Sequence, residues 1–378
     1  MTYRSRAGGP LKTHKKQGIK NGGRGKLHHP PPPSAQADPS SSSSSAHPAL
    51  SSPSDEAILA SLRTALSSTL SSPDFRSTIQ RIKALLYDSK WLEVFTDPEL
   101  LEAYAGRWVP SRALCFRELM VHLPEVREMM LGKQREEADS DDSDGEEEEE
   151  DQDEEEEEEQ GDLRVVSLGG GAGSELAAVA SLLAYRKSSK GKEKACEWVG
   201  ADIGKWGDVL AKIGTAAQGD FDLDSLTVNY VEGNLLSAGS QLLSRIFSPT
   251  SATSSTSSPA PTLYTLLFTL TELLSQSPSS TISLLRFLTS QSPPGTLLLV
   301  ADSASDIASF SLGSERKWPT MTVIDLVMLR MLAGTEGPAW ELVRSEDSRW
   351  YRLGEGVGAD WPVKLENTRY WYRLFRRI

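Results

Sequence analysis

The fold of this chain is decided by the stretch VVSLGGGAGSE at residues 165–175. Its first four residues are an apolar run typical of a buried strand, and the Ala- and Leu-rich residues 175–185 predict a helix. Between them Gly169, Gly171 and Gly173 form a G-x-G-x-G turn, where glycine permits a positive φ and a close approach of backbone to ligand. Because the first N–H groups of a helix have no partner within it, the stretch predicts a nucleotide-binding corner.

The spacing of the glycines excludes two common nucleotide sites. A dinucleotide-binding turn follows G-x-G-x-x-G/A, but Ser174 and Leu176 stand where a third small residue is needed. A phosphate-binding P-loop requires Gly-Lys-Ser/Thr, which does not follow these glycines. A glycine-rich turn in some other α/β protein remains an alternative.

Strand and helix patterns alternate after this turn. Strands are predicted at residues 165–168, 196–201, 226–232, 263–268 and 296–301, and two late strands at 350–353 and 370–375. Helices are predicted at residues 203–213, 237–247, 279–290 and 321–332. This alternation indicates an α/β fold with a mostly parallel sheet, closed by late antiparallel strands.

Composition divides the chain into four parts. Residues 1–54 form a basic, then Pro/Ser-rich arm, and residues 136–160 an acidic linker; we expect both to be disordered. Residues 55–135 have helical periodicity, and residues 161–378 form the α/β domain, with a flexible Ser/Thr/Pro insert at about 248–261.

The helical region contains one expected break. Arg107-Trp108-Val109-Pro110-Ser111-Arg112 interrupts the pattern, and we expect a new helix to start there. Two arginines flanking a tryptophan suit contact with RNA, and the alternative is a structural tryptophan with arginines that fix a turn.

Charge is distributed very unevenly. The net charge is −13, but residues 136–159 hold nineteen acids, so the remainder is basic, and residues 1–29 hold eight Lys/Arg and no acid. Such asymmetry is typical of proteins that handle nucleic acid, although two unrelated solvated tails remain an alternative. The basic arm suits a nuclear or nucleolar address, a non-specific RNA clamp or a solubilising tail.

Cysteine and histidine usage excludes several classes of protein. The two cysteines, Cys115 and Cys196, are far apart, which excludes a disulfide framework and fits a reducing compartment. Four of the five histidines lie in the arm, leaving His122, so we expect neither a zinc site nor a Ser-His-Asp triad. No secretory signal or membrane-spanning run is evident, and we expect a soluble intracellular protein.

The glycine turn with an acidic residue just after it resembles motif I of the Rossmann-like class I S-adenosylmethionine (SAM) methyltransferases. The resemblance implies that SAM is the cofactor, with its methionine part at Gly169, Gly171 and Gly173. It implies further that Asp202 accepts the ribose hydroxyls and that Asn234 contacts the adenine amine. The alternatives are a helix cap for Asp202 and a turn residue for Asn234.

The end of the fourth strand narrows the methylation chemistry. Phe268-Thr269-Leu270-Thr271-Glu272 contains no Asn-Pro-Pro-Tyr, which argues against amino-methylating DNA or protein enzymes, and no cysteine, which argues against C5 methylation of pyrimidines. Methyl transfer to a ring nitrogen or a ribose hydroxyl needs alignment and a base. Glu272 and Asp302 are the candidate catalytic bases, unless both are structural acids.

Aromatic and arginine residues alternate at the C-terminal end, in the segments WYR at 350–352 and RYWYRLFRR at 369–377. Such interleaving suits stacking on RNA bases and contact with phosphates, with Arg376 and Arg377 as candidates. Alternation with period two is equally typical of a sheet strand.

Several blocks resemble a fungal family of SAM-dependent methyltransferases: VVSLGGGAGSELAA, ADIGKW, YVEGNLLS, LLFTLTELL, GTLLLVADS, DSRWYRL and LENTRYWYRLFRR. A member from budding yeast methylates N3 of a uridine in large-subunit (25S) rRNA. The resemblance implies an rRNA methyltransferase that works on the pre-ribosomal large subunit, in the nucleolus of the nucleus and also in the cytoplasm. A non-catalytic ribosome-assembly or RNA-binding factor with this fold, and a protein methyltransferase, remain alternatives.

Overall fold

The computed structural model describes residues 54–88, 90–132, 162–190, 193–237, 239–248, 260–304, 309–311, 317–332 and 337–378. All of them belong to one compact unit, Leu50–Ile378. The predicted arm, acidic linker and Ser/Thr/Pro insert fall almost entirely outside the described residues, so those assignments stay predictions.

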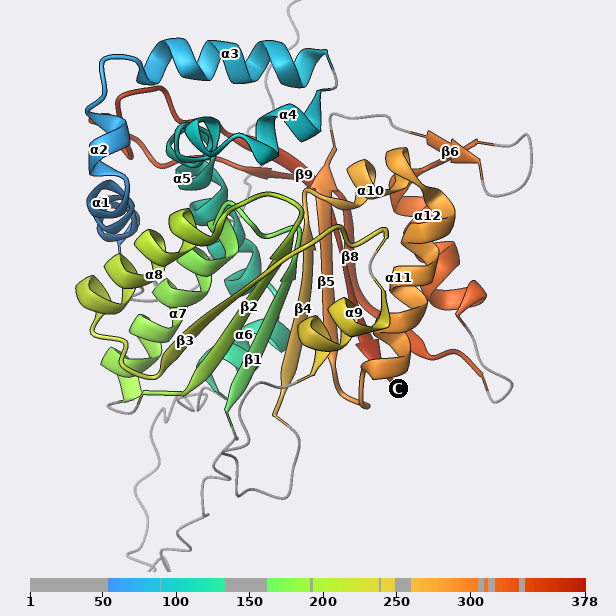
Figure 1. The fold of residues 1–378 in the computed structure, drawn as a ribbon. Helices are drawn as coiled ribbons and strands as arrows, with labels where there is room; N and C mark the ends of the chain where they lie inside the picture. Colours follow the sequence, from blue (N-terminus) through green and yellow to red (C-terminus); the bar gives the residue numbers. More distant parts are fainter. Residues whose placement is uncertain are drawn as a thin grey trace, which may run out of the picture. The chain divides into compact units, whose positions relative to one another are not determined.

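A seven-stranded sheet forms the centre of this unit, in the order β3-β2-β1-β4-β5-β9-β8 (Figure 1). Its strands are β1 (Leu163–Leu168), β2 (Cys196–Asp202), β3 (Leu226–Glu232), β4 (Thr262–Leu267), β5 (Leu297–Ser303), β8 (Trp340–Tyr351) and β9 (Thr368–Arg377). The first five strands are parallel, and β9 is antiparallel to both β5 and β8. The predicted mixed sheet is confirmed, and its order reverses between β1 and β4, where α/β sheets bind ligands.

The burial of the central strands explains why they could be predicted from the sequence. Every residue of β1 and of β4 is buried, because helices cover both faces, and such strands are continuous apolar runs. The edge strand β8 begins ten residues before the predicted 350–353, since its exposed, charged first part lacks that signal. A small second sheet pairs β6 (Ser309–Ser311) with β7 (Lys317–Pro319).

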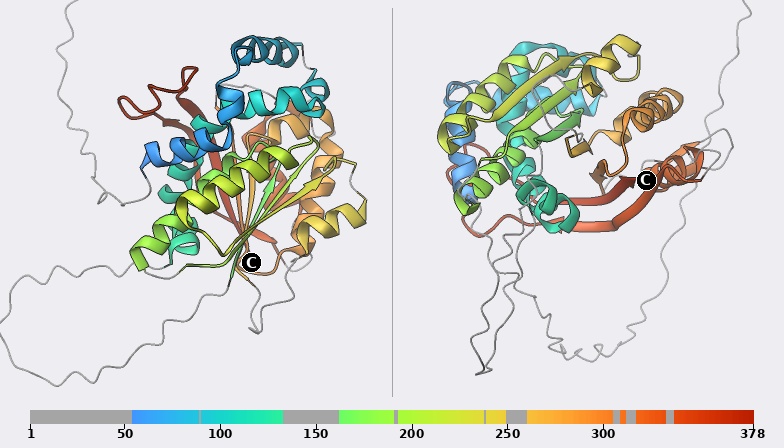
Figure 2. Two further views of the ribbon diagram at one scale, coloured as in Figure 1. Left: turned by 60° about the vertical axis from the view of Figure 1, so that its left-hand side comes forward. Right: turned by 90° about the horizontal axis from the view of Figure 1, so that it is seen from below.

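Helices cover both faces of the sheet (Figures 1 and 2). On one face lie α7 (Ser174–Lys190) and α8 (Gly207–Phe221). On the other lie α9 (Ser240–Phe247), α10 (Leu270–Gln276), α11 (Pro278–Gln291) and α12 (Thr320–Leu326), which continues as a π-helical turn, Val327–Met331. None of the helices in the described ranges is long and apolar enough to cross a membrane.

The N-terminal region adds six helices: α1 (Asp55–Ala65), α2 (Ser67–Leu70), α3 (Phe75–Tyr87), α4 (Trp91–Thr96), α5 (Pro98–His122) and α6 (Pro124–Leu131). α5 packs along α7, and α1 packs on α8. Their apolar side chains join those of α7, α8 and one sheet face in a single buried cluster. The helical region is therefore part of the same hydrophobic core as the sheet.

The predicted helix break at 107–112 is wrong, because α5 continues through Pro110. Proline has no N–H, so the carbonyl of Gly106, four residues earlier, loses its helical partner. The buried indole of Trp361 replaces that partner, since its Nε1–H donates to the Gly106 oxygen at 2.9 Å. A residue far along the chain thus completes the hydrogen bonding of α5.

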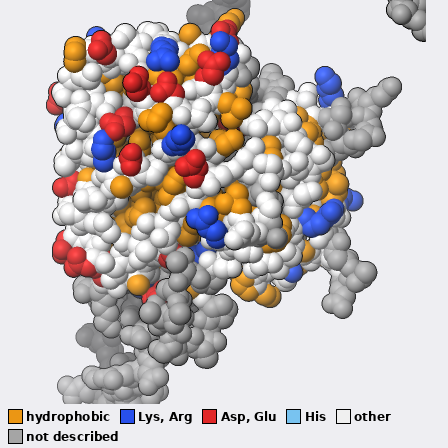
Figure 3. All heavy atoms as spheres, viewed as in Figure 1, with side chains coloured by type: hydrophobic (Ala, Val, Ile, Leu, Met, Phe, Trp, Pro, Cys, Tyr) orange, Lys and Arg blue, Asp and Glu red, His pale blue; other side chains and the backbone are white. Residues whose placement is uncertain are grey.

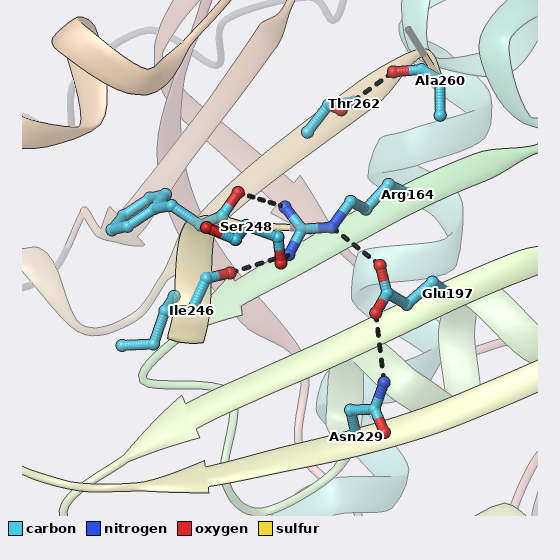
Figure 4. Close-up of polar contacts among 8 residues, drawn as sticks. Arg164, Glu197, Asn229, Ile246, Ser248, Ala260 and Thr262 are labelled. Carbon is cyan, nitrogen blue, oxygen red and sulfur yellow. Dashed lines mark hydrogen bonds and ion pairs between the residues drawn. The ribbon is translucent and has the colours of Figure 1, made fainter. Parts of the chain in front are cut away.

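A buried arginine ties β1 to α9 (Figure 4). The Arg164 guanidinium donates to a Glu197 carboxylate oxygen on β2 at 2.8 Å, and to the carbonyls of Ile246 and Ser248 at 2.8 and 3.1 Å. Glu197 also accepts from the Asn229 side chain on β3 at 3.1 Å. Because this buried cation is paired and meets the carbonyls at the end of α9, it favours that helix end.

Most of the C-terminal arginines and aromatics are structural. Arg373 is buried and pairs with Asp325 and Asp347, while Arg376 pairs with Glu341. Arg377 donates to the carbonyl of Ala339 at 2.8 Å. The alternation in this segment therefore reflects a sheet strand, β9, with its partners on β8 and α12.

Candidate cofactor and active site

A cavity of about 410 Å³ lies at the carboxyl ends of the parallel strands. Its walls come from the glycine turn after β1, from the residues that follow β2, β3 and β4, and from α4 and α5 of the N-terminal helices. Of the predicted site residues, Gly169, Asp202, Asn234 and Glu272 line it. The sheet topology therefore brings together residues that are far apart in the sequence, as predicted.

The glycines of the turn are required for two different reasons. Gly169 and Gly173 have φ values of +82° and +90°, a left-handed conformation that side-chain-bearing residues rarely adopt. At Gly171 the constraint is space, because a Cβ would lie 2.0 Å from Cδ1 of Trp206. The turn is therefore held against the indole of the loop that leads into α8.

The N–H groups of these glycines already have acceptors. Gly169 N–H donates to the carbonyl of Ala201 at 2.7 Å, and Gly171 N–H to the Asp202 carboxylate at 3.4 Å. Gly173 N–H donates to a carbonyl within the turn at 3.1 Å. A carboxylate in this cavity therefore needs a donor other than these three N–H groups.

Asp202 both orders the loop after β2 and faces the cavity. Besides Gly171 N–H, its carboxylate accepts from Gly204 N–H at 2.8 Å and from the Trp206 indole at 3.2 Å. Burial raises the pKa of Asp202, and these hydrogen bonds oppose the shift. The helix-cap alternative is not seen, because α8 has Trp206 at its N-cap without a side-chain cap hydrogen bond, and Asp202 instead closes a turn with Gly204. The ribose contact stays a prediction.

Asn234 has the turn role, one of its two predicted alternatives. Its side-chain oxygen accepts from Leu236 N–H at 2.9 Å, which closes an Asx turn after β3. The residue also lines the cavity, so its contact with an adenine amine stays a prediction.

Aromatic side chains form one part of the cavity wall. The Trp206 ring lies 5.6 Å from that of Tyr104 on α5 and 6.0 Å from that of Phe95 on α4, centroid to centroid. Two of these three rings come from the N-terminal helices. Such a wall offers flat apolar surface to a heteroaromatic ligand.

Phe268, directly after β4, has a strained backbone, with a φ of +58°. Its N–H donates to the carbonyl of Ala301 at 2.8 Å, and its ring packs against Phe116 with centroids 5.6 Å apart. A non-glycine residue in this conformation costs free energy, and such strain clusters at functional sites. The Phe268 ring lies in the cavity wall, to which Glu272 also belongs.

The two arginines that flank Trp108 have different environments. Arg107 is buried, pairs with Glu366 and lies with its guanidinium carbon 5.5 Å from the Trp108 ring centroid, which is a structural role. Arg112 lies in the cavity wall, donates to the Tyr104 hydroxyl at 3.1 Å and covers the Phe268 ring at 5.6 Å.

Arg112 is half-buried and remains a cation. Burial lowers the pKa of the guanidinium, but Tyr104, Glu175 and Asp302 outweigh that effect and raise it overall. A positive charge is therefore fixed inside the cavity wall.

Glu175, at the start of α7, is buried with only 3% of its surface exposed, and lines the cavity. Its Oε1 atom has no hydrogen-bond partner among the described residues. Burial raises the pKa of Glu175 to about 7, with an opposing effect of Arg112. An unsatisfied buried carboxyl oxygen is costly, so in a cavity wall it indicates a ligand that donates to it.

The structure separates the two candidate bases. Asp302 accepts from the backbone N–H groups of Thr271 and Ser303, both at 2.8 Å, which is a structural role. Glu272 lines the cavity and accepts only from Gln276, at 3.1 Å, among the hydrogen bonds found for its side chain in the described residues. Burial raises the pKa of Glu272 to about 7, and the charges of Asp202 and Asp302 add to the shift.

The charges of the cavity select among nucleotide ligands. Besides the ion pair of Lys90 with Glu93, the cavity wall holds the carboxyl groups of Asp202, Glu175 and Glu272 and the half-buried guanidinium of Arg112. Each of these carboxyl groups that is ionised repels a phosphate group and attracts a ligand with positive charge.

Residues 62–376 match the protein family described as "Putative SAM-dependent methyltransferase". The chain belongs to this family. SAM, a sulfonium cation with an ammonium and a carboxylate, is therefore its cofactor, and the acidic cavity with an orphaned carboxyl oxygen fits that chemistry. When bound, SAM supplies a methyl group that a nucleophile can attack.

A curated relative is the 25S rRNA (uridine(2843)-N(3))-methyltransferase of Saccharomyces cerevisiae, 28% identical over 318 residues that cover 79% of this chain and 76% of the relative.

Among solved structures, an O-methyltransferase family protein from Burkholderia thailandensis has 13% identity and a TM-score of 0.37, covering 81% of this chain and 73% of its own. A SAM-dependent methyltransferase from Methanosarcina mazei has 11% identity and a TM-score of 0.32, covering 58% and 93%. A variant of the 16S rRNA (adenine(1408)-N(1))-methyltransferase of Catenulisporales acidiphilia has 14% identity and a TM-score of 0.31, covering 58% and 85%.

Three residues of the cavity wall are not predicted as site residues by the sequence. From the sequence, Arg112 is a candidate for RNA contact only, and Glu175 is noted only as the acidic residue that follows the glycine turn. Trp206 is given no role. For Glu175 a signal is present, since an acidic residue at the start of a helix beside a glycine turn faces the same cavity. For Arg112 there is no such signal, because no local sequence pattern shows that α5 packs beside the glycine turn.

Proposed function

We propose that this SAM-dependent methyltransferase acts on N3 of a uridine in large-subunit ribosomal RNA. The observation that carries the proposal is the relationship to the yeast 25S rRNA (uridine(2843)-N(3))-methyltransferase, which extends over 79% of the chain. The family match over residues 62–376 includes most of the N-terminal helices as well as the sheet domain.

The chemistry of the cavity is compatible with this reaction. N3 of uracil carries a proton that must leave before or during methyl transfer, so a base near the reacting atom is needed. Glu272 is that base in the proposal: its carboxylate accepts the N3 proton, while the N3 electron pair takes the methyl group and the carbon–sulfur electron pair stays on sulfur. A pKa of about 7 suits this role, because a base works best near the ambient pH.

Phe268 and Phe116 provide the apolar surface against which an extruded base is aligned. Both line the cavity near Glu272, and both are held by packing against each other. Enzymes that modify a base extract it into such a pocket and hold it by stacking.

A cationic group at the same end of the sheet suits the flanking RNA. Trp350 is half exposed, and the guanidinium carbons of Arg352 and Arg369 lie 5.4 and 5.9 Å from its ring centroid. Neither arginine has an ion pair within the described ranges, unlike Arg376. The backbone of Arg369 is hydrogen-bonded to the residue that follows β5: its carbonyl accepts from Ala304 N–H at 3.1 Å. Arg369 therefore lies at the same edge of the sheet as the cavity.

One face of the molecule, drawn in Figure 3, has an uneven distribution of charge. Its acidic side chains gather over the half that contains α7 and α8, whereas Lys and Arg side chains are seen on both halves. A polyanion is therefore repelled more from the α7 and α8 side than from the side of α10 to α12.

The decisive experiment offers the protein two substrates with isotopically labelled SAM: protein-free 25S rRNA that lacks the modification, and ribosomal proteins. Nucleoside mass spectrometry of the RNA should show N3-methyluridine. Label in protein alone would establish a protein methyltransferase. SAM binding without label in either substrate would favour the non-catalytic assembly factor.

We propose further that the enzyme meets its substrate on the pre-ribosomal large subunit in the nucleolus. Support comes from the eight Lys/Arg among residues 1–29 and from the proposed substrate. A fluorescently tagged chain should be nucleolar, and deletion of residues 1–29 should reduce its nuclear share.

A further inference from the structure

Several N–H groups of the glycine turn are not available to the carboxylate of the methionine part of SAM. The N–H groups of Gly169, Gly171 and Gly173 all donate within the protein, and Glu175 at the start of α7 accepts from its own backbone N–H. Part of the anion-binding capacity that a strand–turn–helix corner normally offers is thus in use. A nearby cation would give the cofactor carboxylate a charge-assisted partner that neutral N–H groups do not provide.

Arg112 has the position and the free donors for that carboxylate. Its guanidinium carries five N–H groups, of which one donates to Tyr104 among the hydrogen bonds of the described residues. The Phe268 ring, 5.6 Å from the guanidinium carbon, and the Tyr104 hydroxyl fix its orientation. A planar guanidinium held in this way binds a carboxylate through two parallel hydrogen bonds.

Glu175 supplies the complementary charge. It is close enough to Arg112 for the two charges to affect each other, yet no hydrogen bond joins them and its Oε1 has no partner within the described part of the chain. A cation and an anion on one cavity wall, each with unused hydrogen-bonding capacity, match the carboxylate and ammonium of an α-amino acid.

We propose that Arg112 binds the carboxylate and Glu175 the ammonium of the methionine part of SAM. The inference rests on SAM as cofactor and is independent of the RNA substrate. It places one of the cofactor-binding residues on α5, so that the N-terminal helices complete the SAM site. An arginine that served the RNA backbone would instead be expected near the surface, as Arg352 and Arg369 are.

The test measures, by calorimetry on the full chain without RNA, the affinity of three ligands. SAM has both groups, decarboxylated SAM keeps the ammonium only, and 5′-methylthioadenosine has neither. Arg112→Met should weaken SAM binding about 10- to 100-fold and leave decarboxylated SAM unchanged. Glu175→Gln should weaken both of these ligands, and neither variant should alter binding of 5′-methylthioadenosine.

Two controls keep the outcome interpretable. Arg107→Met removes a buried arginine of the same helix that lies outside the cavity wall, and should bind all three ligands as the wild type does. Unchanged binding of 5′-methylthioadenosine shows that a variant is folded. If Arg112→Met loses equal factors for SAM and decarboxylated SAM, or none for either, the assignment of the carboxylate is overturned.

Discussion

At the scale of single residues, the carboxyl group of Glu175 makes stability depend on pH. Burial raises its pKa from 4.5 to about 7, so its favourable contribution is full below pH 4.5 and is lost as pH rises through 7. Without SAM, Glu175→Gln should therefore be more stable than the wild type at pH 8, by up to about 3 kcal/mol. The difference in urea-unfolding free energy should shrink towards pH 5, and a constant difference would contradict the assigned burial.

Glu272→Gln tests the base. Because the carboxylate is the active form and its pKa is about 7, wild-type single-turnover methylation should rise with pH through about 7. The variant should lose roughly 10²- to 10⁴-fold in rate, together with that rise. SAM affinity serves as the control, since the variant must still bind its cofactor. If the pH profile of the variant is the same as that of the wild type, Glu272 is not the catalytic base.

The sequence predicted these residues unequally. Asp202 and Glu272 could be located because strand ends in a parallel sheet converge on one edge. The separate roles of Glu272 and Asp302 could not, since they depend on two backbone N–H groups that only the folded loop aims at Asp302. The positive φ of Phe268 could not be predicted from the sequence either, because phenylalanine has no preference for that conformation.

At the scale of elements, α5 depends on the indole of Trp361. Trp361→Phe leaves the Gly106 carbonyl buried without a partner, which should cost about 1–3 kcal/mol of unfolding free energy. Pro110→Ala restores a backbone N–H for the same carbonyl, so Trp361→Phe should cost less in that background. A double-mutant cycle from denaturant unfolding measures this coupling, and strictly additive effects would refute it.

The C-terminal hairpin allows a matched test of RNA binding. Arg352→Gln with Arg369→Gln should weaken binding of an rRNA fragment and reduce the salt dependence of log K by about 2, one for each phosphate that is no longer neutralised. Arg376→Gln, on the same hairpin but paired with Glu341, is the control and should change neither. If the double variant and Arg376→Gln have equal effects, Arg352 and Arg369 contribute only general surface charge and not a specific RNA contact.

Elements were predictable where one local pattern was sufficient. The buried strands β1, β4 and β5 could be read as apolar runs because helices cover both of their faces. The continuity of α5 could not, since a proline predicts a break and its compensation comes from Trp361, far along the chain. The arginines of β9 were ambiguous until their acidic partners were placed.

At the scale of the molecule, the helical N-terminal region and the sheet share one hydrophobic core and one cavity. The sequence predicted two separate parts, because the acidic stretch at residues 136–160 interrupts the periodic pattern of apolar residues between them. Deletion of residues 1–53 should leave SAM affinity intact, whereas deletion of residues 1–132 should abolish it, because α5 carries Tyr104 and Arg112. Calorimetry on both shortened chains checks this, and binding by the shorter one would show that the sheet domain is sufficient.

The hydrogen bond between Trp361 and Gly106 also has a consequence for biosynthesis. Ribosomes make chains from the N-terminus at about 5–20 residues per second, and domains generally fold as units once they have emerged. Here α5, which is made early, acquires the hydrogen-bond donor for its Gly106 carbonyl only after Trp361 has left the ribosome. A nascent chain stalled before residue 361 should therefore remain sensitive to protease around α5, and release of the full chain should bring protection.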